Sequence, residues 1–287
     1  MKRATTLLII DPQNDFCDLP DLYRPLDPLT GARVAPALAV AGAHADMQRL
    51  AAFISALGAG LTDIAVTIDS HHRYDIAHPT FWQKANGEAV SPFTQINAAQ
   101  VRAGEFTPRD PAALPRALRY LDALEANGRY TLMVWPVHCE IGSWGNNIHA
   151  DVRAAYGAWE EARHGVATKI IKGTNPWTEH YSAVQAEVPA SDPDTQLNRV
   201  LIDRLGAADL LLIAGEASSH CVRATTEHIV ANLPAEHAAR MVLLTDCMSP
   251  VHGFEDEQAR FYADMKARGA RLATSVELRS EIGEVVE

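Results

Sequence analysis

Short runs of apolar residues recur along the chain and alternate with segments whose apolar positions follow a helical spacing. Six runs have the length and the composition of buried strands. They are residues 6–10, 64–68, 168–171, 210–214, 241–245 and 271–273. Because strands that alternate with helices form a parallel sheet covered on both faces, the pattern predicts an α/β fold, a three-layer α/β/α sandwich with a central, doubly wound parallel sheet.

The segments between these runs carry recognisable helix signals. One helix is predicted around Leu50, Phe53, Ile54 and Leu57. A glycine, Gly58, follows this group, and residues 197–205 show the same spacing before Gly206. Residues 255–268 begin with acidic side chains, end with basic ones and are followed by Gly269, which matches the charge preference of a helix and its usual stop signal.

One stretch breaks this alternation. Residues 83–134 contain no clear strand–helix unit, although residues 114–124 have a helical pattern. A length of 287 residues is common for one α/β domain. We therefore expect a single domain over residues 1–287 with an insertion at about 83–134.

Composition and charge exclude several classes of partner. The net charge of −11 disfavours nucleic acid and anionic membrane surfaces, both of which require basic residues. The chain has no apolar run of the roughly 18 residues that a membrane span needs, and its first apolar run is too short for a signal peptide. It has four widely spaced cysteines and no CxxC pair, which is typical of a reducing compartment. We expect a soluble, cytoplasmic protein that acts on a small molecule.

Three chemically active residues stand where predicted strands end. Asp11 follows the first strand, Lys172 follows the third, and Cys221 begins a helical segment soon after the fourth. A helix N-terminus and a nearby ammonium group lower the pKa of a thiol, and a nearby carboxylate can accept its proton. Each residue taken alone also fits an ordinary role, namely a turn residue, a solvated strand end and a small buried side chain.

A second group of polar residues fits a divalent metal. Asp69 and His71 are two positions apart, so in an extended segment their side chains project to the same side, whereas His72 projects to the other. His138 lies in a separate segment. A carboxylate and two imidazoles suit Zn²⁺, Fe²⁺ or Mn²⁺, but by spacing alone solvated loop histidines explain the pattern equally well.

Together, the motifs IIDPQNDFC, IIKGTNPWTEHYSA and GEASSHCVRAT resemble those of the isochorismatase-like cysteine hydrolases, and in particular the nicotinamidases. The resemblance covers nearly the whole chain except the insertion. It implies an Asp11–Lys172–Cys221 triad on a parallel sheet, with Cys221 as the nucleophile. It also implies a cis peptide bond between Glu216 and Ala217, which would direct the Ala217 and Cys221 amides toward an oxyanion. Glu216 replaces a usual apolar residue, and we expect it to change the charge of the pocket.

The resemblance further implies a metal site and a ring-binding pocket. The D-x-H and WPxHC motifs of nicotinamidases occur as Asp69-Ser70-His71 and residues 135–139, so Asp69, His71 and His138 would bind the metal, zinc first and iron or manganese as alternatives. The sequence departs from the D-x-H pattern, since Ser70 replaces a usual aromatic residue and no proline follows His71.

Further residues are implied at the same positions of the family. His78 is a candidate fourth metal ligand. Phe16 and Trp135 would hold a flat ring between them, and Tyr181 would line the pocket. Ordinary core packing is the alternative for all three aromatic residues.

The residues and the resemblance together predict hydrolysis of a small primary amide through a thioester, with nicotinamide converted to nicotinate. Three alternatives stay open. The substrate is another carbamoyl or ureido compound, the chain is a non-catalytic binding protein of the same fold, or Cys221 is a redox sensor with Cys17 or Cys139 as its partner. We also expect a homo-oligomer, as is common in the family.

Overall fold

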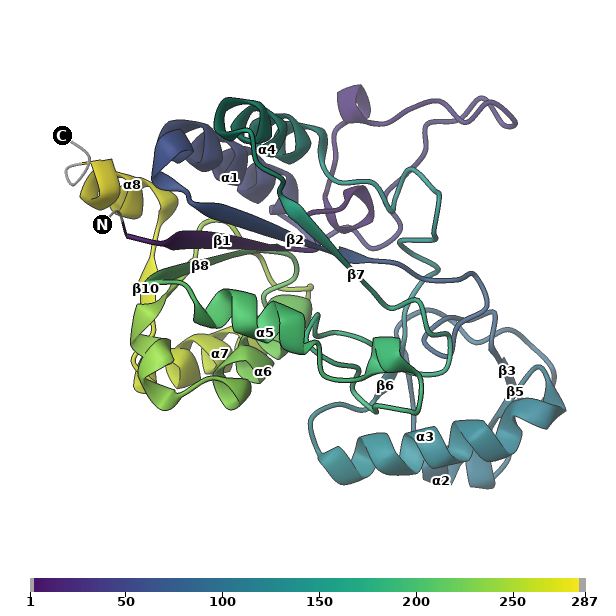
Figure 1. The fold of residues 1–287 in the computed structure, drawn as a ribbon. Helices are drawn as coiled ribbons and strands as arrows, with labels where there is room; N and C mark the ends of the chain where they lie inside the picture. Colours follow the sequence, from purple (N-terminus) through teal and green to yellow (C-terminus); the bar gives the residue numbers. More distant parts are fainter. Residues whose placement is uncertain (1–2, 284–287) are drawn as a thin grey trace.

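A six-stranded parallel sheet lies at the centre of the computed structural model, which describes residues 3–283 (Figure 1). Its strand order is β10-β9-β8-β1-β2-β7. The strands are β1 (Thr5–Ile10), β2 (Asp63–Asp69), β7 (Thr168–Lys172), β8 (Leu210–Gly215), β9 (Met241–Leu244) and β10 (Arg271–Ala273). The six predicted strands are confirmed, with small shifts at their ends.

Helices cover both faces of this sheet, so the predicted three-layer architecture is confirmed. One face carries α1 (Ala43–Leu57), α4 (Ala150–Arg163) and α8 (Ser275–Gly283) (Figure 1). The other carries α5 (Arg199–Gly206), α6 (Cys221–Asn232) and α7 (Glu255–Ala267). The chain extends the sheet in both directions from β1, toward β7 and toward β10. In such a sheet the crevice at the carboxyl ends of the central strands is the usual place for a ligand.

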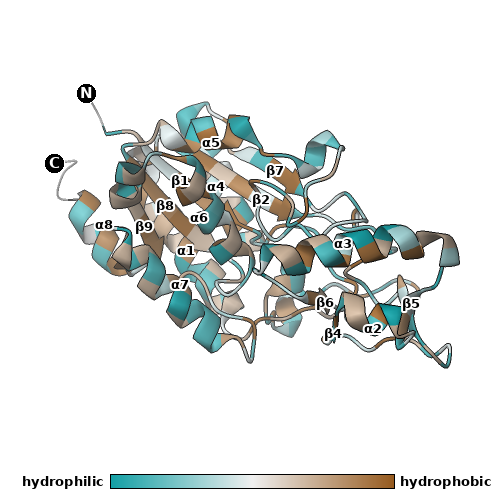
Figure 2. Cartoon of the chain, turned by 90° about the horizontal axis from the view of Figure 1, so that it is seen from below, coloured by the Kyte–Doolittle hydropathy of each residue, from teal (hydrophilic) through white to brown (hydrophobic). Residues whose placement is uncertain are grey.

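The burial of the strands explains their sequences. β1 and β8 are buried at every position, which accounts for their continuous apolar runs. β7 lies at the edge of the sheet, and its exposed Lys169 and Ile171 alternate with less exposed positions. Figure 2 shows the apolar strands between helices whose outer faces are largely hydrophilic. Within residues 3–283, no helix is both long and apolar enough to cross a membrane.

The stretch predicted as an insertion, residues 83–134, lies beside the sheet (Figure 1). It contains the predicted helix, α3 (Leu114–Asn127), and a short helix, α2 (Ala98–Arg102). It also contains two antiparallel pairs that the sequence did not predict, β3–β5 and β4–β6. These strands are β3 (Trp82–Lys84), β4 (Thr94–Ile96), β5 (Phe106–Pro108) and β6 (Leu132–Val134). Strands of three residues are too short to show a periodic pattern.

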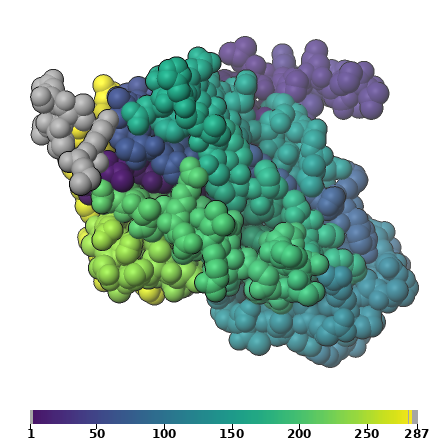
Figure 3. Space-filling view, viewed as in Figure 1, coloured from purple at the N-terminus to yellow at the C-terminus, as the bar shows by residue number. Residues whose placement is uncertain are grey.

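The connection from β1 to α1 extends away from the sheet, and its purple atoms project from the body of the molecule in Figure 3. Leu22 and Leu29 are exposed there. Short 3-10 helices complete the fold at Asn14–Phe16, Asp21–Tyr23, Gly58–Gly60, Pro111–Ala113, Pro193–Thr195 and Ala235–Arg240. The first of them places Phe16 close to the carboxyl end of β1.

Candidate active site

The three predicted catalytic residues meet at the carboxyl ends of the strands. Asp11 follows β1, Lys172 ends β7 and Cys221 begins α6. The Lys172 ammonium nitrogen lies 3.0 Å from Asp11 Oδ2 and 3.8 Å from Cys221 Sγ. Asp11 and Lys172 are buried, and Cys221 is 7% exposed. Segments that are far apart in the sequence therefore form one carboxylate–ammonium–thiol cluster.

The backbone at Asp11 aims its carboxylate into this cluster. Asp11 has a φ of 44°, a conformation that residues other than glycine seldom adopt. Thr67, on β2, supports it in two ways, because its hydroxyl accepts a hydrogen bond from the Asp11 amide at 3.0 Å and donates one to Asp11 Oδ1 at 2.5 Å. Burial raises the pKa of Asp11, and the charge of Lys172 opposes that rise.

Lys172 is held as a cation at the centre of the site. Its ammonium group donates to Asp69 Oδ1 at 2.8 Å and to the His180 carbonyl at 2.9 Å. Burial alone would lower the pKa of Lys172, but the carboxylates of Asp11 and Asp69 raise it well above its usual value. Lys172 therefore balances two buried negative charges and is not a proton donor near neutral pH.

The acidity of the Cys221 thiol differs from the prediction. The sequence predicted a lowered pKa, whereas burial raises the pKa of Cys221 well above its usual value, with Lys172 opposing and the carboxylates of Asp11 and Asp69 adding to the rise. The extent of burial and the second carboxylate were not visible in the sequence. The resting group is thus a thiol, and a base has to remove its proton for Cys221 to react.

The two residues expected to supply oxyanion amides both line the cavity of the thiol. The Glu216–Ala217 peptide bond is cis, as predicted. Within residues 3–283, the N–H groups of Ala217 and Cys221 have no hydrogen-bond acceptor, and both residues line the cavity beside Sγ. Gly215, just before them, is required to be glycine, since a Cβ atom there would lie 1.9 Å from the Ile10 carbonyl oxygen. The Glu216 side chain does not line the cavity, so the expected change in pocket charge is wrong.

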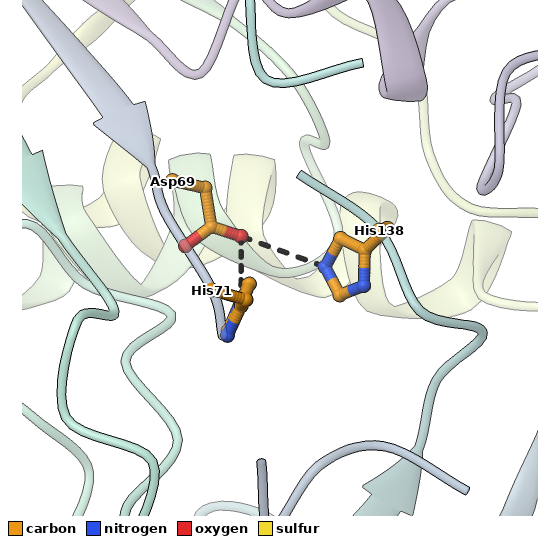
Figure 4. A group of neighbouring side chains, drawn as sticks. All are labelled: Asp69, His71 and His138. Atoms are coloured by element: carbon orange, nitrogen blue, oxygen red, sulfur yellow. Dashed lines mark hydrogen bonds and ion pairs between the residues drawn. The ribbon is translucent and has the colours of Figure 1, made fainter. Parts of the chain in front are cut away.

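The predicted metal ligands also come together, on the other side of Asp69. Asp69, His71 and His138 are buried, and one ligand atom from each lies within 4.8 Å of the others. Figure 4 shows one oxygen of the Asp69 carboxylate joined by dashed lines to both imidazole rings. Its Oδ2 atom is 3.0 Å from His71 Nε2 and 3.5 Å from His138 Nε2.

Each ring has an oxygen acceptor beside its Nδ1 atom, so Nε2 is the nitrogen that could bind a metal. His71 Nδ1 lies 3.1 Å from an oxygen of Asp75, and His138 Nδ1 lies 2.8 Å from the Pro136 carbonyl oxygen. These acceptors favour a proton on each Nδ1. Burial alone would lower the pKa of His71, but the carboxylates of Asp69 and Asp75 raise it well above its usual value. His71 Nε2 therefore also carries a proton, which it donates to Asp69 and which a bound metal would displace. One carboxylate oxygen and two imidazole nitrogens in this orientation fit Zn²⁺, Fe²⁺ or Mn²⁺.

Two further histidines of this region, His78 and His72, lie outside the group of potential metal ligands. His78 Nε2 lies 3.3 Å from His138 Nδ1, on the side of that ring away from Asp69, and His78 is not in the group of three potential ligands. His72 is exposed, as its opposite direction in the sequence predicted. The fourth-ligand role of His78 therefore has no support from the geometry.

A small cavity connects the thiol with the metal group. It measures about 20 Å³, which is room for about one water molecule. The predicted ring-binding residues Phe16, Trp135 and Tyr181 all line it. Four lining residues that sequence reasoning missed are Leu38, Glu179, His220 and Val251. A ring-sized ligand has to displace some of these side chains when it enters.

Two of the missed residues are polar. Glu179 is buried, its Oε1 accepts from the His180 amide at 2.8 Å, and its Oε2 has no hydrogen-bond partner within the described chain. His220 packs against the rings of Trp135 and Phe254, and burial lowers its pKa to about 4. Glu179 lies in the quoted motif after Lys172 and His220 directly precedes the nucleophile, but neither position alone indicates a side chain in the cavity.

A larger hollow and two further thiols of the described chain lie apart from this site. A larger hollow of about 570 Å³ beside β7 is lined by none of the candidate catalytic or metal-binding residues. Cys17 and Cys139 are buried free thiols that do not line the cavity of Cys221, and burial raises the pKa of both. The site is therefore the cavity between Cys221 and the metal group.

Comparison with solved structures gives the class of fold that this site occupies. Comparison with models of known protein families and with curated proteins finds no match. Over nearly their whole length, however, solved nicotinamidases share the architecture. The Acinetobacter baumannii nicotinamidase/pyrazinamidase has a TM-score of 0.60 at 18% identity, covering 96% of this chain and 98% of that chain.

Two further structures agree. The yeast nicotinamidase has a TM-score of 0.57 at 19% identity, over 94% of this chain and 99% of that chain. The Pyrococcus horikoshii pyrazinamidase, solved in complex with zinc, has a TM-score of 0.50 at 18% identity, over 94% and 98% of the two chains. The chain thus has the α/β fold of these solved nicotinamidases, as the sequence predicted.

Proposed function

We propose that this chain is a cysteine amidohydrolase that converts a small primary amide, nicotinamide, into the carboxylic acid and ammonia. The observation that carries the proposal is the buried cluster of Asp11, Lys172 and Cys221, open to a cavity that also contains aromatic rings and a metal-binding group. The fold of solved nicotinamidases supports the same activity.

In the first half of the reaction, Asp11 accepts the proton of Cys221. The thiolate attacks the amide carbon, so an S–C bond forms and the carbonyl oxygen becomes an oxyanion. The N–H groups of Ala217 and Cys221, which have no acceptor within the described chain, would donate to it. Collapse of this intermediate breaks the C–N bond, and Asp11 returns the proton to the departing ammonia, which leaves a thioester.

In the second half, Asp11 removes a proton from water, which attacks the thioester carbon. The C–S bond then breaks, the acid is released and the sulfur recovers its proton. Lys172 favours the ionised form of both carboxylates of the site between these steps. Phe16 and Trp135 would hold the ring of the substrate between them.

A divalent metal, zinc in the first place, would be held by Asp69, His71 and His138, where it would supply a Lewis acid that binds a ring nitrogen or a water molecule. The solved zinc complex of the Pyrococcus horikoshii pyrazinamidase supports this choice for the present chain.

The test is ammonia release from a panel of nicotinamide, pyrazinamide and small carbamoyl or ureido compounds, with and without a chelator. We expect turnover of nicotinamide, and loss of at least about 10⁴-fold in kcat for Cys221→Ala because the covalent step is gone. Turnover of ureido compounds alone would show that the substrate is a carbamoyl or ureido compound and not nicotinamide. This alternative is included because the cavity is small. Full activity of Cys221→Ala would contradict the mechanism.

A further inference from the structure

The side chain of Glu216 turns away from the cavity into a second, fully buried cluster. It is 0% exposed, and its Oε2 accepts a hydrogen bond from the Ser249 amide at 3.1 Å. Its Oε1 atom is buried and has no N–H or O–H donor as a partner within the described chain, and its carboxyl group faces that of Asp46, which is 2% exposed and lies on α1. Asp46 in turn accepts from the Ser249 hydroxyl at 2.5 Å and pairs with Arg49.

This cluster joins the turn that carries the oxyanion amides to the segment after β9. The Gly215 amide donates to the Cys247 carbonyl at 3.0 Å, and the Ser218 amide donates to the Ser249 carbonyl at 2.9 Å. Ser249 thus contacts the turn through its carbonyl and through its own amide, on either side of Ala217. Because Glu216 shares a peptide bond with Ala217, a shift of its side chain changes the direction of the Ala217 N–H.

Two facing carboxyl groups need one proton between them. Burial raises the pKa of Glu216, and the carboxylates of Asp46 and Asp18 add to the rise. The other titratable groups that face Glu216 are Cys17, from the connection after β1, and Tyr262, on α7, both of which stay neutral near neutral pH because burial raises their pKa. A neutral Glu216 donates to Asp46 and still accepts from Ser249, which satisfies both contacts.

We propose that Glu216 is a positioning residue for the oxyanion site, whose side chain, held by Asp46 and the Ser249 amide, fixes the Ala217 N–H in the direction of the cavity. The inference rests on the proposed amide hydrolysis. It assigns a role to the residue at which this sequence departs from its apparent family. If Glu216 only filled space, its replacement would affect folding, but it would not weaken the binding of an oxyanion more than the binding of a planar product.

The test compares Glu216→Ala, Glu216→Gln and the control Glu236→Ala, which changes an exposed glutamate. The probe is nicotinaldehyde, the aldehyde analogue of the substrate. Cys221 adds to its carbonyl, so an S–C bond forms, the C=O double bond becomes a single bond and the thiol proton passes to Asp11. The resulting oxygen occupies the oxyanion position, whereas nicotinate, the product, binds without an S–C bond.

We expect Glu216→Ala to weaken nicotinaldehyde inhibition and to lower kcat, each by about 10- to 100-fold, because the loss of one whole oxyanion donor costs about 10²–10³-fold. Nicotinate affinity and KM should change by less than about threefold, since neither depends on an oxyanion. Glu216→Gln should restore most of both losses, because its amide can donate to Asp46 and accept from Ser249. Glu236→Ala should match the wild type.

Unchanged aldehyde inhibition and kcat in folded Glu216→Ala would overturn the inference, as would equal losses for aldehyde and nicotinate or a failure of Glu216→Gln to restore them. If Glu216→Ala does not fold, Asp46→Ala, which removes the partner from α1, must show the same selective loss of aldehyde affinity; a normal aldehyde affinity there overturns the inference. A wild-type protein that releases no ammonia from any amide overturns the proposed function as well, so the two failures are distinguishable.

Discussion

The carboxylate of Asp69 belongs to both halves of the site. One oxygen, Oδ1, accepts from the Lys172 ammonium group at 2.8 Å, and the other, Oδ2, faces His71 and His138. Burial alone would raise the pKa of Asp69, but His71 and Lys172 hold it well below its usual value. A single buried anion therefore couples the thiol cluster to the metal-binding group.

The first prediction is that Asp69→Asn disturbs both halves, whereas His138→Asn disturbs one. Both variants should lose metal affinity by at least about 100-fold, because each changes one of the three proposed ligands. Only Asp69→Asn should speed alkylation of Cys221 by iodoacetamide, by about threefold or more at pH 8, because the Asp69 charge raises the pKa of that thiol.

The measurements are the bound metal per chain and the alkylation rate, both of which are independent of turnover. Equal alkylation rates in the two variants would show that Asp69 does not couple the two groups. The exposed neighbour His72 provides the control His72→Asn, which should leave both quantities unchanged.

The second prediction concerns two lysines on the same edge strand. Lys172→Met leaves the carboxylates of Asp11 and Asp69 buried and without their cation, which should lower the free energy of unfolding by about 3–5 kcal/mol. Lys169→Met removes a cation whose pair with Glu160 is about one-third exposed, so its cost should stay below about 1 kcal/mol.

Urea unfolding of both variants at pH 7 measures this difference. Similar losses for the two substitutions would contradict the placement of Lys172 between two buried anions. Both changes are on β7 and both introduce methionine, so the two variants share the strand and the type of substitution.

Much of this architecture was predictable because β1 and β8 are buried on both faces and therefore read as continuous apolar runs. The strand ends then directed attention to Asp11, Lys172 and Cys221 without knowledge of distances. The acidity of Cys221 was not predictable, because it depends on how deeply the fold buries the thiol and on the charge of Asp69, which comes from another strand.

Glu179 and His220 show the same limit in another way. Both are in irregular segments or at a helix start, where no period indicates the direction of a side chain. Their place in the cavity results from packing against residues distant in the sequence, such as Tyr120, whose hydroxyl accepts from the Glu179 amide. The strands at residues 82–134 were not predicted because each has only three residues, which is too short to show a periodic pattern.

The third prediction is a metal-specific gain in stability. After treatment with a chelator, Zn²⁺ at about 100 times its Kd should stabilise the protein by about 2.7 kcal/mol and raise its Tm by roughly 5–10 °C. Mg²⁺ should have no such effect, because it prefers oxygen ligands and the group offers two imidazoles. His71→Ala should abolish the shift and His72→Ala should preserve it. An equal shift in both variants would place the metal elsewhere.

The fourth prediction follows from a buried carboxyl group outside the site. The Glu187 side chain is 1% exposed, its Oε2 lies 3.1 Å from Arg129, and its Oε1 has no partner within the described chain. Burial raises the pKa of Glu187 from 4.5 to about 7, although the charge of Arg129 opposes the rise. The folded protein therefore holds a proton on Glu187 that the unfolded chain releases above about pH 4.5.

Since the folded state binds the extra proton, the contribution of Glu187 to stability is fully present below about pH 4.5 and is lost as the pH rises to about 7. The loss is on the order of 3 kcal/mol. Glu187→Gln cannot ionise and does not have this pH dependence. The free energy of unfolding of Glu187→Gln minus that of the wild type should therefore increase by about this amount from pH 5 to pH 8, as measured by urea titrations. Glu236→Gln, at an exposed site, should show no such gain. A constant difference between Glu187→Gln and the wild type across this range would mean that Glu187 is already ionised in the folded protein at pH 5.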